Sequence, residues 1–275
     1  MSTIREPAVA GMFYPAIPTQ LHRELDELFR SAKPRKVEGT LLALIAPHAG
    51  YMYSGSTAAV GYKLLSSLNF DTVVVVGPSH REYFRGISVF SGDAYRTPLG
   101  DVPIDMKLRE ELVAQSEAIV MSHVGHRAEH SVEVQLPFLQ KVLRNFTFLP
   151  IVMGDQRREY CDILADALAA TLKNRNALLI ASSDLSHYHP HDVALQLDKR
   201  VIQEVEAYNP DGLMEKLERD EVEACGGGPM VAVMKAAKML GSNRSYILHH
   251  CTSGDITGEK DAVVGYLSVA LAKVN

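Results

Sequence analysis

The sequence predicts an α/β fold: a three-layer α/β/α sandwich around a mainly parallel or mixed central sheet. Segments of strand character alternate with segments of helical character along most of the chain, which is typical of βαβ units. Several strand segments are continuously apolar and do not alternate, and residues 72–76, with four consecutive valines, are the clearest case. Continuous apolar runs indicate strands that are covered on both faces, as a three-layer sandwich requires.

Hydrophobic periodicity places the individual elements. Residues 20–31, for example, carry Leu21, Leu25 and Leu28 on one helical face. The other assignments follow the same reasoning, since short apolar runs favour strands and longer amphipathic stretches favour helices. We expect helices at 20–31, 56–68, 103–115, 157–173, 192–207 and 229–240, and strands at 41–46, 72–76, 86–90, 146–154, 177–182, 245–254 and 262–272.

Length and composition are those of an ordinary globular protein. The 275 residues are 47% hydrophobic and 22% charged, which suffices for a sizeable core without disulfides or a structural metal. We find no repeat, no low-complexity segment and no Gly/Ser-rich linker. The sequence therefore predicts one domain over residues 1–275.

Charge and cysteine content narrow the function classes. The net charge is −5 and no basic block appears, which argues against a nucleic-acid partner. Three widely spaced cysteines indicate a reducing compartment and no disulfide framework. The N-terminus is interrupted by charge and proline, unlike a signal peptide, and no apolar run approaches the roughly 20 residues of a membrane helix. We expect a cytoplasmic protein that does not enter the membrane.

Histidines follow three of the expected strands. His48 comes after the strand at 41–46, His80 after 72–76, and Asp184 and His187 after 177–182. In open α/β sheets, ligands bind at the carboxyl ends of the strands, so these side chains are candidates for one site. Neutral imidazoles brought together there would suit Fe, Zn, Cu or Ni.

Cys225 is the strongest candidate for a third metal ligand. It lies in "EACGGGPM", directly before an apolar helical pattern, and a thiol near a helix N-terminus is favoured as the thiolate. The alternative is a loop cap with a buried, inert cysteine, and spacing alone leaves both interpretations open.

Residues 126–139 collect further polar groups at the expected start of a helix: His126, Glu129, His130 and Glu133. They could orient a ligand or transfer protons. The residues alone favour a charged capping segment with a solvated face.

Two other histidine clusters are weaker candidates. His187, His189 and His191 form one, and His249, His250 and Cys251 form the other. Such clusters are more often packed or surface residues than metal ligands. No G-x-S-x-G motif and no phosphate-loop fingerprint appears, which argues against a serine hydrolase and a nucleotide site.

Several motifs in one order give the chain a family resemblance. It resembles the Memo family, also named AmmeMemoRadiSam system protein B in prokaryotes, over nearly its whole length. The motifs that carry the resemblance are "REPAVAGMFYP", "APHAGYMYSGS", "VVGPSH", "YRTPLG", "EHSVEVQLPFL", "SSDLSHY", "CGGGP", "TSGD" and "VVGY".

The Memo family in turn resembles class III extradiol ring-cleavage dioxygenases. This implies an α/β sandwich with a metal cleft at the strand ends, His48 and His80 as ligands, and His187 as the acid/base histidine. Asp184 would lie nearby and His130 would be a further pocket histidine. The dioxygenases use a glutamate as third ligand where Memo-type chains carry a cysteine, here Cys225. The resemblance implies Fe(II) as the first expectation, with copper or zinc as alternatives.

Three functional hypotheses follow. The first is a metal-dependent redox enzyme that uses His187 to move protons. The second is a module that binds a small-molecule or peptide ligand in the cleft without turnover, because animal members of the family are associated with signalling and cell motility. The third is a zinc-dependent hydrolase with a metal-activated water. The prokaryotic family name also implies a functional link to a radical-SAM protein.

Overall fold

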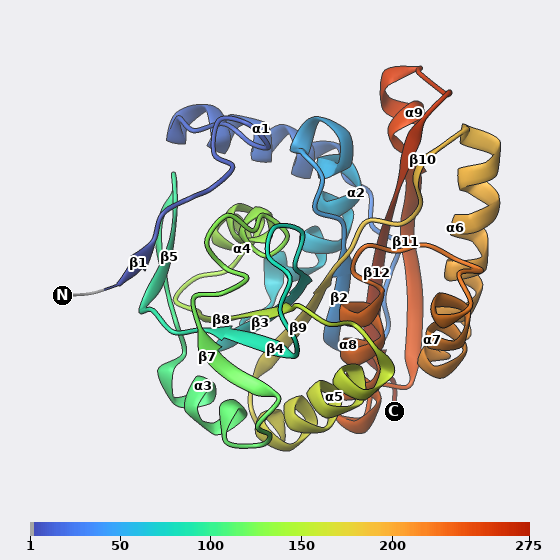
Figure 1. The fold of residues 1–275 in the computed structure, drawn as a ribbon. Helices are drawn as coiled ribbons and strands as arrows, with labels where there is room; N and C mark the ends of the chain where they lie inside the picture. The colour runs from blue at the N-terminus through green and yellow to red at the C-terminus, as the bar shows by residue number, and fades with distance from the viewer. Residues whose placement is uncertain (1–2) are drawn as a thin grey trace.

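The computed structural model describes residues 3–275. Its main sheet has nine strands in the order β10-β12-β2-β9-β3-β8-β4-β7, with β11 paired to β12, and β1, β5 and β6 form a small second sheet (Figure 1). The strands are β1 (Ile4–Arg5), β2 (Thr40–Ala46), β3 (Thr72–Pro78), β4 (Ile87–Phe90), β5 (Ala94–Thr97), β6 (Gly100–Pro103), β7 (Ile119–Ser122), β8 (Thr147–Met153), β9 (Ala177–Ser182), β10 (His187–His189), β11 (Arg244–Thr252) and β12 (Val263–Lys273). The α-helices are α1 (Pro18–Ser31), α2 (Tyr51–Lys63), α3 (Met106–Val113), α4 (Leu136–Val142), α5 (Arg158–Leu172), α6 (His191–Glu206), α7 (Pro210–Glu218), α8 (Gly227–Met239) and α9 (Ser253–Thr257), and 3-10 turns follow α2 at 64–67 and precede α4 at 133–135.

The centre of the main sheet is parallel. Strands β2, β9, β3 and β8 run in one direction, whereas β12 is antiparallel to β2 and β4 is antiparallel to β8. The sheet is therefore mixed. Because β2, β3 and β9 are parallel neighbours, the residues that follow each of them emerge at the same edge of the sheet.

Helices cover both faces of the sheet. Helices α1, α2 and α4 pack together on one side, and α5, α8, α7 and α6 pack in sequence on the other, as Figure 1 shows for α1 and α2 against α5 and α8. The sequence-based prediction of an α/β sandwich with a mixed sheet is confirmed.

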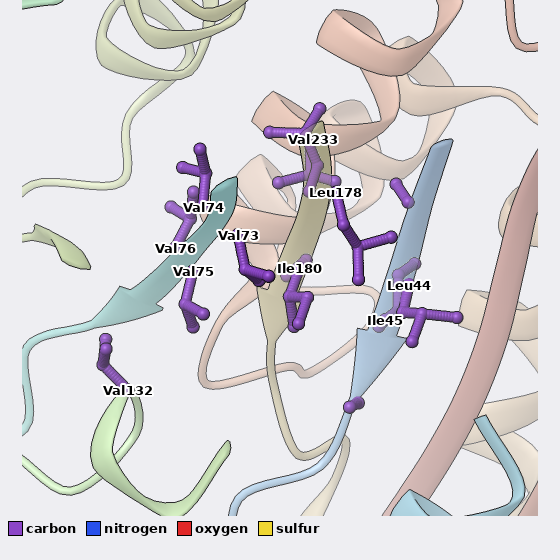
Figure 2. Packing of buried hydrophobic residues seen from close by; sticks show 14 of the residues in the cluster. Leu44, Ile45, Val73, Val74, Val75, Val76, Val132, Leu178, Ile180 and Val233 are labelled. Carbon is purple, nitrogen blue, oxygen red and sulfur yellow. The ribbon is translucent and has the colours of Figure 1, made fainter. Parts of the chain in front are cut away.

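The continuous apolar strands form the core between these layers. Val73 to Val76 of β3 are fully buried, as are Leu178 and Ile180 of β9. Figure 2 shows the side chains of these strands and of β2 lying side by side, with Val132 from the loop before α4 next to β3. The site-bearing strand ends thus extend from a rigid, close-packed layer.

Some expected elements differ in detail. The helix expected at 103–115 begins only at Met106, because Asp105 caps it by accepting from the Leu108 amide, and Gly100–Pro103 forms β6 instead. The strand expected at 245–254 ends at Thr252, which forms a capping box with Asp255 and starts α9. No helix of the described residues is long and apolar enough to cross a membrane.

Candidate metal centre

Three separate elements bring His48, His80 and Cys225 together. His48 follows β2, His80 follows β3, and Cys225 immediately precedes the N-cap of α8. The Nε2 atom of His48 lies 3.1 Å from Sγ of Cys225, and one ligand atom from each of the three residues lies within 4.8 Å of the other two. The structure thus places two imidazoles and a thiol around one point.

A hydrogen-bond network fixes the ring of His48, which is buried. Its Nδ1 atom is 2.9 Å from Oγ of Ser182. The Ser182 hydroxyl already donates to the Ser131 carbonyl at 2.6 Å, and its oxygen accepts from Nε2 of Gln135 at 2.8 Å. Since the serine proton is used, the His48 ring must donate from Nδ1. The lone pair of Nε2 therefore faces Cys225.

The surroundings also favour the neutral form of this imidazole. Burial lowers the pKa of His48 well below its usual value, and the neighbouring His130 and His80 lower it further. A neutral ring is the form that binds a metal ion.

A buried carboxylate fixes the ring of His80. Glu129 accepts from Nδ1 of His80 at 2.9 Å and from its backbone amide at 2.5 Å. The amides of His130 and Ser131 also donate to Glu129. Burial by itself would raise the pKa of Glu129, but the hydrogen bonds and charge of His80 outweigh it and lower the pKa to about 2. The arrangement is that of a carboxylate that orients a metal-binding histidine.

His80, Glu129 and His130 form a second group close enough to hold an ion. Glu129, however, already accepts four hydrogen bonds, three on Oε1 and one on Oε2, and two of them come from His80 itself. We therefore assign Glu129 to orientation and not to direct binding.

His130 lies over the other two histidines. Its ring stacks on His80 with centroids 4.7 Å apart and meets His48 edge-on at 5.4 Å, while Phe13 packs on it at 4.8 Å. Burial lowers the pKa of His130 to about 4, so this third ring is also neutral near pH 7. Its Nδ1 atom is buried without a hydrogen-bond partner among the described residues.

Glycines allow the loop of Cys225 to approach β9. A Cβ atom at Gly226 would lie 2.3 Å from the Ser182 carbonyl oxygen, and one at Gly228 would lie 2.7 Å from Cβ of Gln156. The Gln156 side chain in turn donates to the Cys225 carbonyl and accepts from the Gly228 amide, each at 2.8 Å. The glycine run is thus required by close packing.

The thiol of Cys225 is more protonated than its helix-terminal position predicts. Burial raises its pKa, and the charge of Asp184 raises it further. Without an ion, the thiol keeps its proton near pH 7 and is 3.1 Å from the free lone pair of His48.

Asp184 connects the loops of two candidate ligands, His48 and Cys225. Its Oδ1 accepts from the His48 amide at 2.8 Å, its amide is 3.3 Å from Sγ of Cys225, and its carbonyl accepts from the Cys225 amide at 3.2 Å. Burial raises its pKa to about 7, although the amides of His48 and Ala49 oppose this shift. The hydrogen bonds of Asp184 hold the site together, and its expected catalytic part stays a prediction.

His187 begins β10 and is half-buried. Its Nδ1 donates to the Leu185 carbonyl at 2.8 Å, so Nε2 is left as the acceptor of the neutral ring. Burial lowers its pKa, which keeps the ring neutral near pH 7.

The segment 126–139 differs from the expected solvated capping segment. The helix begins only after residue 132, and Glu129 and Glu133 are both buried with different partners. Glu133 binds the N-terminal residues Arg5 and Tyr14, and His126 is buried between Tyr95 and the Ser88 carbonyl. The interpretation as a solvated face was wrong because carboxylates in this loop are neutralised by groups distant in sequence.

The side chains of the two weaker histidine clusters make hydrogen bonds to neighbouring side chains. His189 contacts Glu223, His191 contacts Thr252, His250 contacts Asp198, and Thr57 contacts both His249 and Cys251. Sequence reasoning did not find the supporting residues Ser182 and Gln135, which carry no pattern of their own.

A groove lies away from the three candidate ligands. This groove of about 600 Å³ runs between α1, α2 and α9, where Glu24, Met52 and Ile256 line it, and none of its lining residues belongs to the metal cluster. The candidate site is therefore identified by side-chain geometry and not by this groove.

Comparison with a solved structure supports the fold. A crystal structure of an uncharacterized protein from Escherichia coli K12 superimposes with a TM-score of 0.59 at 17% identity, covering 84% of this chain and 100% of that one. At this identity the likeness shows the fold alone.

Sequence relatives cover the chain almost completely. A MEMO1 family protein from Methanosarcina mazei is 40% identical over 97% of this chain and 98% of its own length, and one from Sulfurisphaera tokodaii is 38% identical over 97% and 98%. The family model for Memo-like proteins matches residues 5–270. The chain therefore belongs to the Memo-like protein family.

Proposed function

We propose that His48, His80 and Cys225 bind one transition-metal ion, and that the protein is a metal-dependent redox enzyme. The observation that carries the proposal is the approach of Nε2 of His48 to Sγ of Cys225 at 3.1 Å, within a group of three ligand atoms. Iron(II) is the favoured metal and copper is second. The substrate would be a small molecule that approaches the ion from the side of His187.

The donor atoms fit such an ion. Bonds of the length that zinc makes, roughly 2.0 Å to nitrogen and 2.3 Å to sulfur at a tetrahedral angle, would separate the two ligand atoms by about 3.5 Å. The observed separation between His48 and Cys225 is shorter by a fraction of an ångström, so a small opening suffices. Imidazoles suit Fe, Cu and Zn, and a thiolate suits Cu(I) and Zn. Three protein ligands leave open positions for a substrate.

His187, near the candidate ligands, would transfer protons. A bound iron or copper ion would supply electron transfer and substrate activation. His187 presents Nε2 as an acceptor because Leu185 holds its Nδ1 proton, so it can take a proton from a substrate group and return it. His130 covers the rings of His48 and His80 and shields the centre from water on that side.

Metal stoichiometry tests the proposal. The protein is loaded anaerobically with Fe(II), and the metal content is compared with that of the variants His48→Ala, His80→Ala and Cys225→Ser. We expect one equivalent in the native protein, strong loss in each variant, and no loss in His22→Ala, whose side chain is exposed on α1. Full stoichiometry in all three ligand variants would remove the site.

A zinc-dependent hydrolase is the second candidate. Two imidazoles and a thiolate also suit zinc, and His187 would then act on a metal-bound water. Metal analysis of protein isolated from its native host separates the two, because a redox-silent metal alone would favour the hydrolase. Ligand binding without any turnover by metal-loaded protein would instead favour the small-molecule or peptide-binding module.

A further inference from the structure

A fully buried carboxylate, Glu133, ties the N-terminal segment to the loop before α4. Its oxygens accept from Nη1 of Arg5 at 2.5 Å, from the amides of Ala8 and Val9 at 2.7 and 3.1 Å, and from the Tyr14 hydroxyl at 2.5 Å. All four donors come from residues 5–14. An acid buried this completely persists because each of its oxygens is satisfied.

Arg5 extends the connection to the metal cluster. Besides Glu133, its guanidinium donates from Nε to the His126 carbonyl at 2.7 Å and from Nη2 to the Glu129 carbonyl. The planar guanidinium has donors in fixed directions, so it holds these three points in one geometry. Arg5 is 6% exposed, which keeps water from competing for the donors.

The loop that Arg5 holds has no regular structure of its own. Residues 123–132 contain neither helix nor strand. Glu129 lies in this loop, and its carboxylate fixes both the ring and the amide of His80. The clamp, a hydrogen bond from Arg5 to the Glu129 carbonyl, therefore connects the N-terminal segment to the residue whose carboxylate contacts the His80 ring.

We propose that Arg5, held by Glu133, is a positioning residue of the metal centre, acting through Glu129 on His80. The proposal rests on the proposed metal function of His80. The N-terminal segment thus helps to orient a candidate ligand, although the segment itself supplies no ligand.

The test compares Arg5→Gln with native protein in two measurements. The first, on metal-free protein, uses long-range ¹H–¹⁵N spectra to read the tautomer of His80. We expect the Nδ1-protonated form in native protein and a tautomer mixture in the variant. The second is metal affinity, measured with Co(II) by its visible spectrum, and we expect a loss of about 10- to 100-fold with a changed coordination band. Arg5→Lys keeps the charge but not the planar fork, and should behave like Arg5→Gln.

Arg109→Gln is the matched control. Arg109 is also a buried arginine, but its hydrogen bonds go to the carbonyls of Phe90 and Gly92 and not to the loop 123–132 that Arg5 holds. It should lose stability while the His80 tautomer and Co(II) affinity stay unchanged. Tyr14→Phe, which removes a single donor to Glu133, serves as the milder variant if Arg5→Gln does not fold, with a smaller shift in the same direction.

The two proposals fail differently. A native tautomer and native Co(II) affinity in the Arg5 variants, or in Tyr14→Phe, overturn the clamp and leave the metal site standing. Native protein that binds no metal, with a tautomer change on Arg5 substitution, overturns the metal function and leaves the clamp standing. An equal change in Arg109→Gln overturns the clamp, because it shows a general effect of lost stability.

Discussion

The Oγ atom of Ser182 accepts a hydrogen bond from Nδ1 of His48, so the Nε2 lone pair of His48 faces Cys225. Replacing Ser182 with alanine should therefore weaken metal binding, by about 10- to 100-fold, because the ring loses its fixed tautomer. Metal titration of folded Ser182→Ala protein measures this. Ser242, another buried serine that donates to a backbone carbonyl, supplies the control, and Ser242→Ala should bind metal as native protein does. Equal affinities for both variants would contradict the role of Ser182.

Metal binding should release a proton from Cys225. Because burial raises the pKa of this thiol, it is protonated in metal-free protein at pH 7 and must deprotonate to become a ligand. Calorimetric titrations in buffers with different ionisation enthalpies should give about one proton released per ion bound. Cys225→Ser should lose this release, whereas Cys251→Ser, which alters another buried cysteine, should keep it.

His126 should make the protein sensitive to mild acid. Burial lowers its pKa to about 3, while the unfolded chain binds a proton near pH 6.5. The unfolded state therefore binds more protons between these values, so stability falls as the pH falls below 6.5. Between pH 7 and pH 5 this histidine alone should remove about 2 kcal/mol from the free energy of unfolding. Urea unfolding at the two pH values measures it.

The variant His126→Gln isolates the contribution of His126 to the pH dependence of stability. His126→Gln should lose about 2 kcal/mol less than native protein between pH 7 and pH 5, whatever its stability at pH 7. His22→Gln, on an exposed position of α1, should show the native difference. An unchanged difference in His126→Gln would show that this residue is not buried in its neutral form.

Replacing Gly226 with alanine should destabilise the protein. A Cβ atom there would lie 2.3 Å from the Ser182 carbonyl oxygen, so Gly226→Ala must displace either β9 or the Cys225 loop. We expect a destabilisation of roughly 1–3 kcal/mol together with weaker metal binding. At Gly50 the nearest atom to an added Cβ is 3.6 Å away, so Gly50→Ala should be nearly neutral. Chemical unfolding and metal titration of both variants decide the point.

The sequence predicted the layers, and the convergence of the candidate ligands, better than it predicted the residues that hold their side chains in place. Apolar runs such as Val73 to Val76 carry their strand signal locally, and parallel strands must end at one edge, so the convergence of His48 and His80 could be anticipated. The joining of Cys225 to them depends on α8 packing beside β9, which no local pattern states.

The interpretation of Glu129 and Glu133 failed for a related reason. A charged residue indicates a solvated surface unless its partner is known, and here the partners are His80 and Arg5, which are 49 and 128 residues away. Burial of a carboxylate is decided by such long-range donors. The spacing of residues along the sequence does not reveal which distant donors will bind a carboxylate.

The candidate ligands are separated by long stretches of chain, since 31 residues lie between His48 and His80 and 144 between His80 and Cys225. An unfolded chain therefore offers an ion no ready-made chelate, and tight capture requires the assembled sheet. An ion that binds only the native state would stabilise it. At a free ion concentration 1,000 times the dissociation constant, binding would add about 4 kcal/mol to the free energy of unfolding. Chelation would then lower the melting temperature of a protein whose core remains untouched.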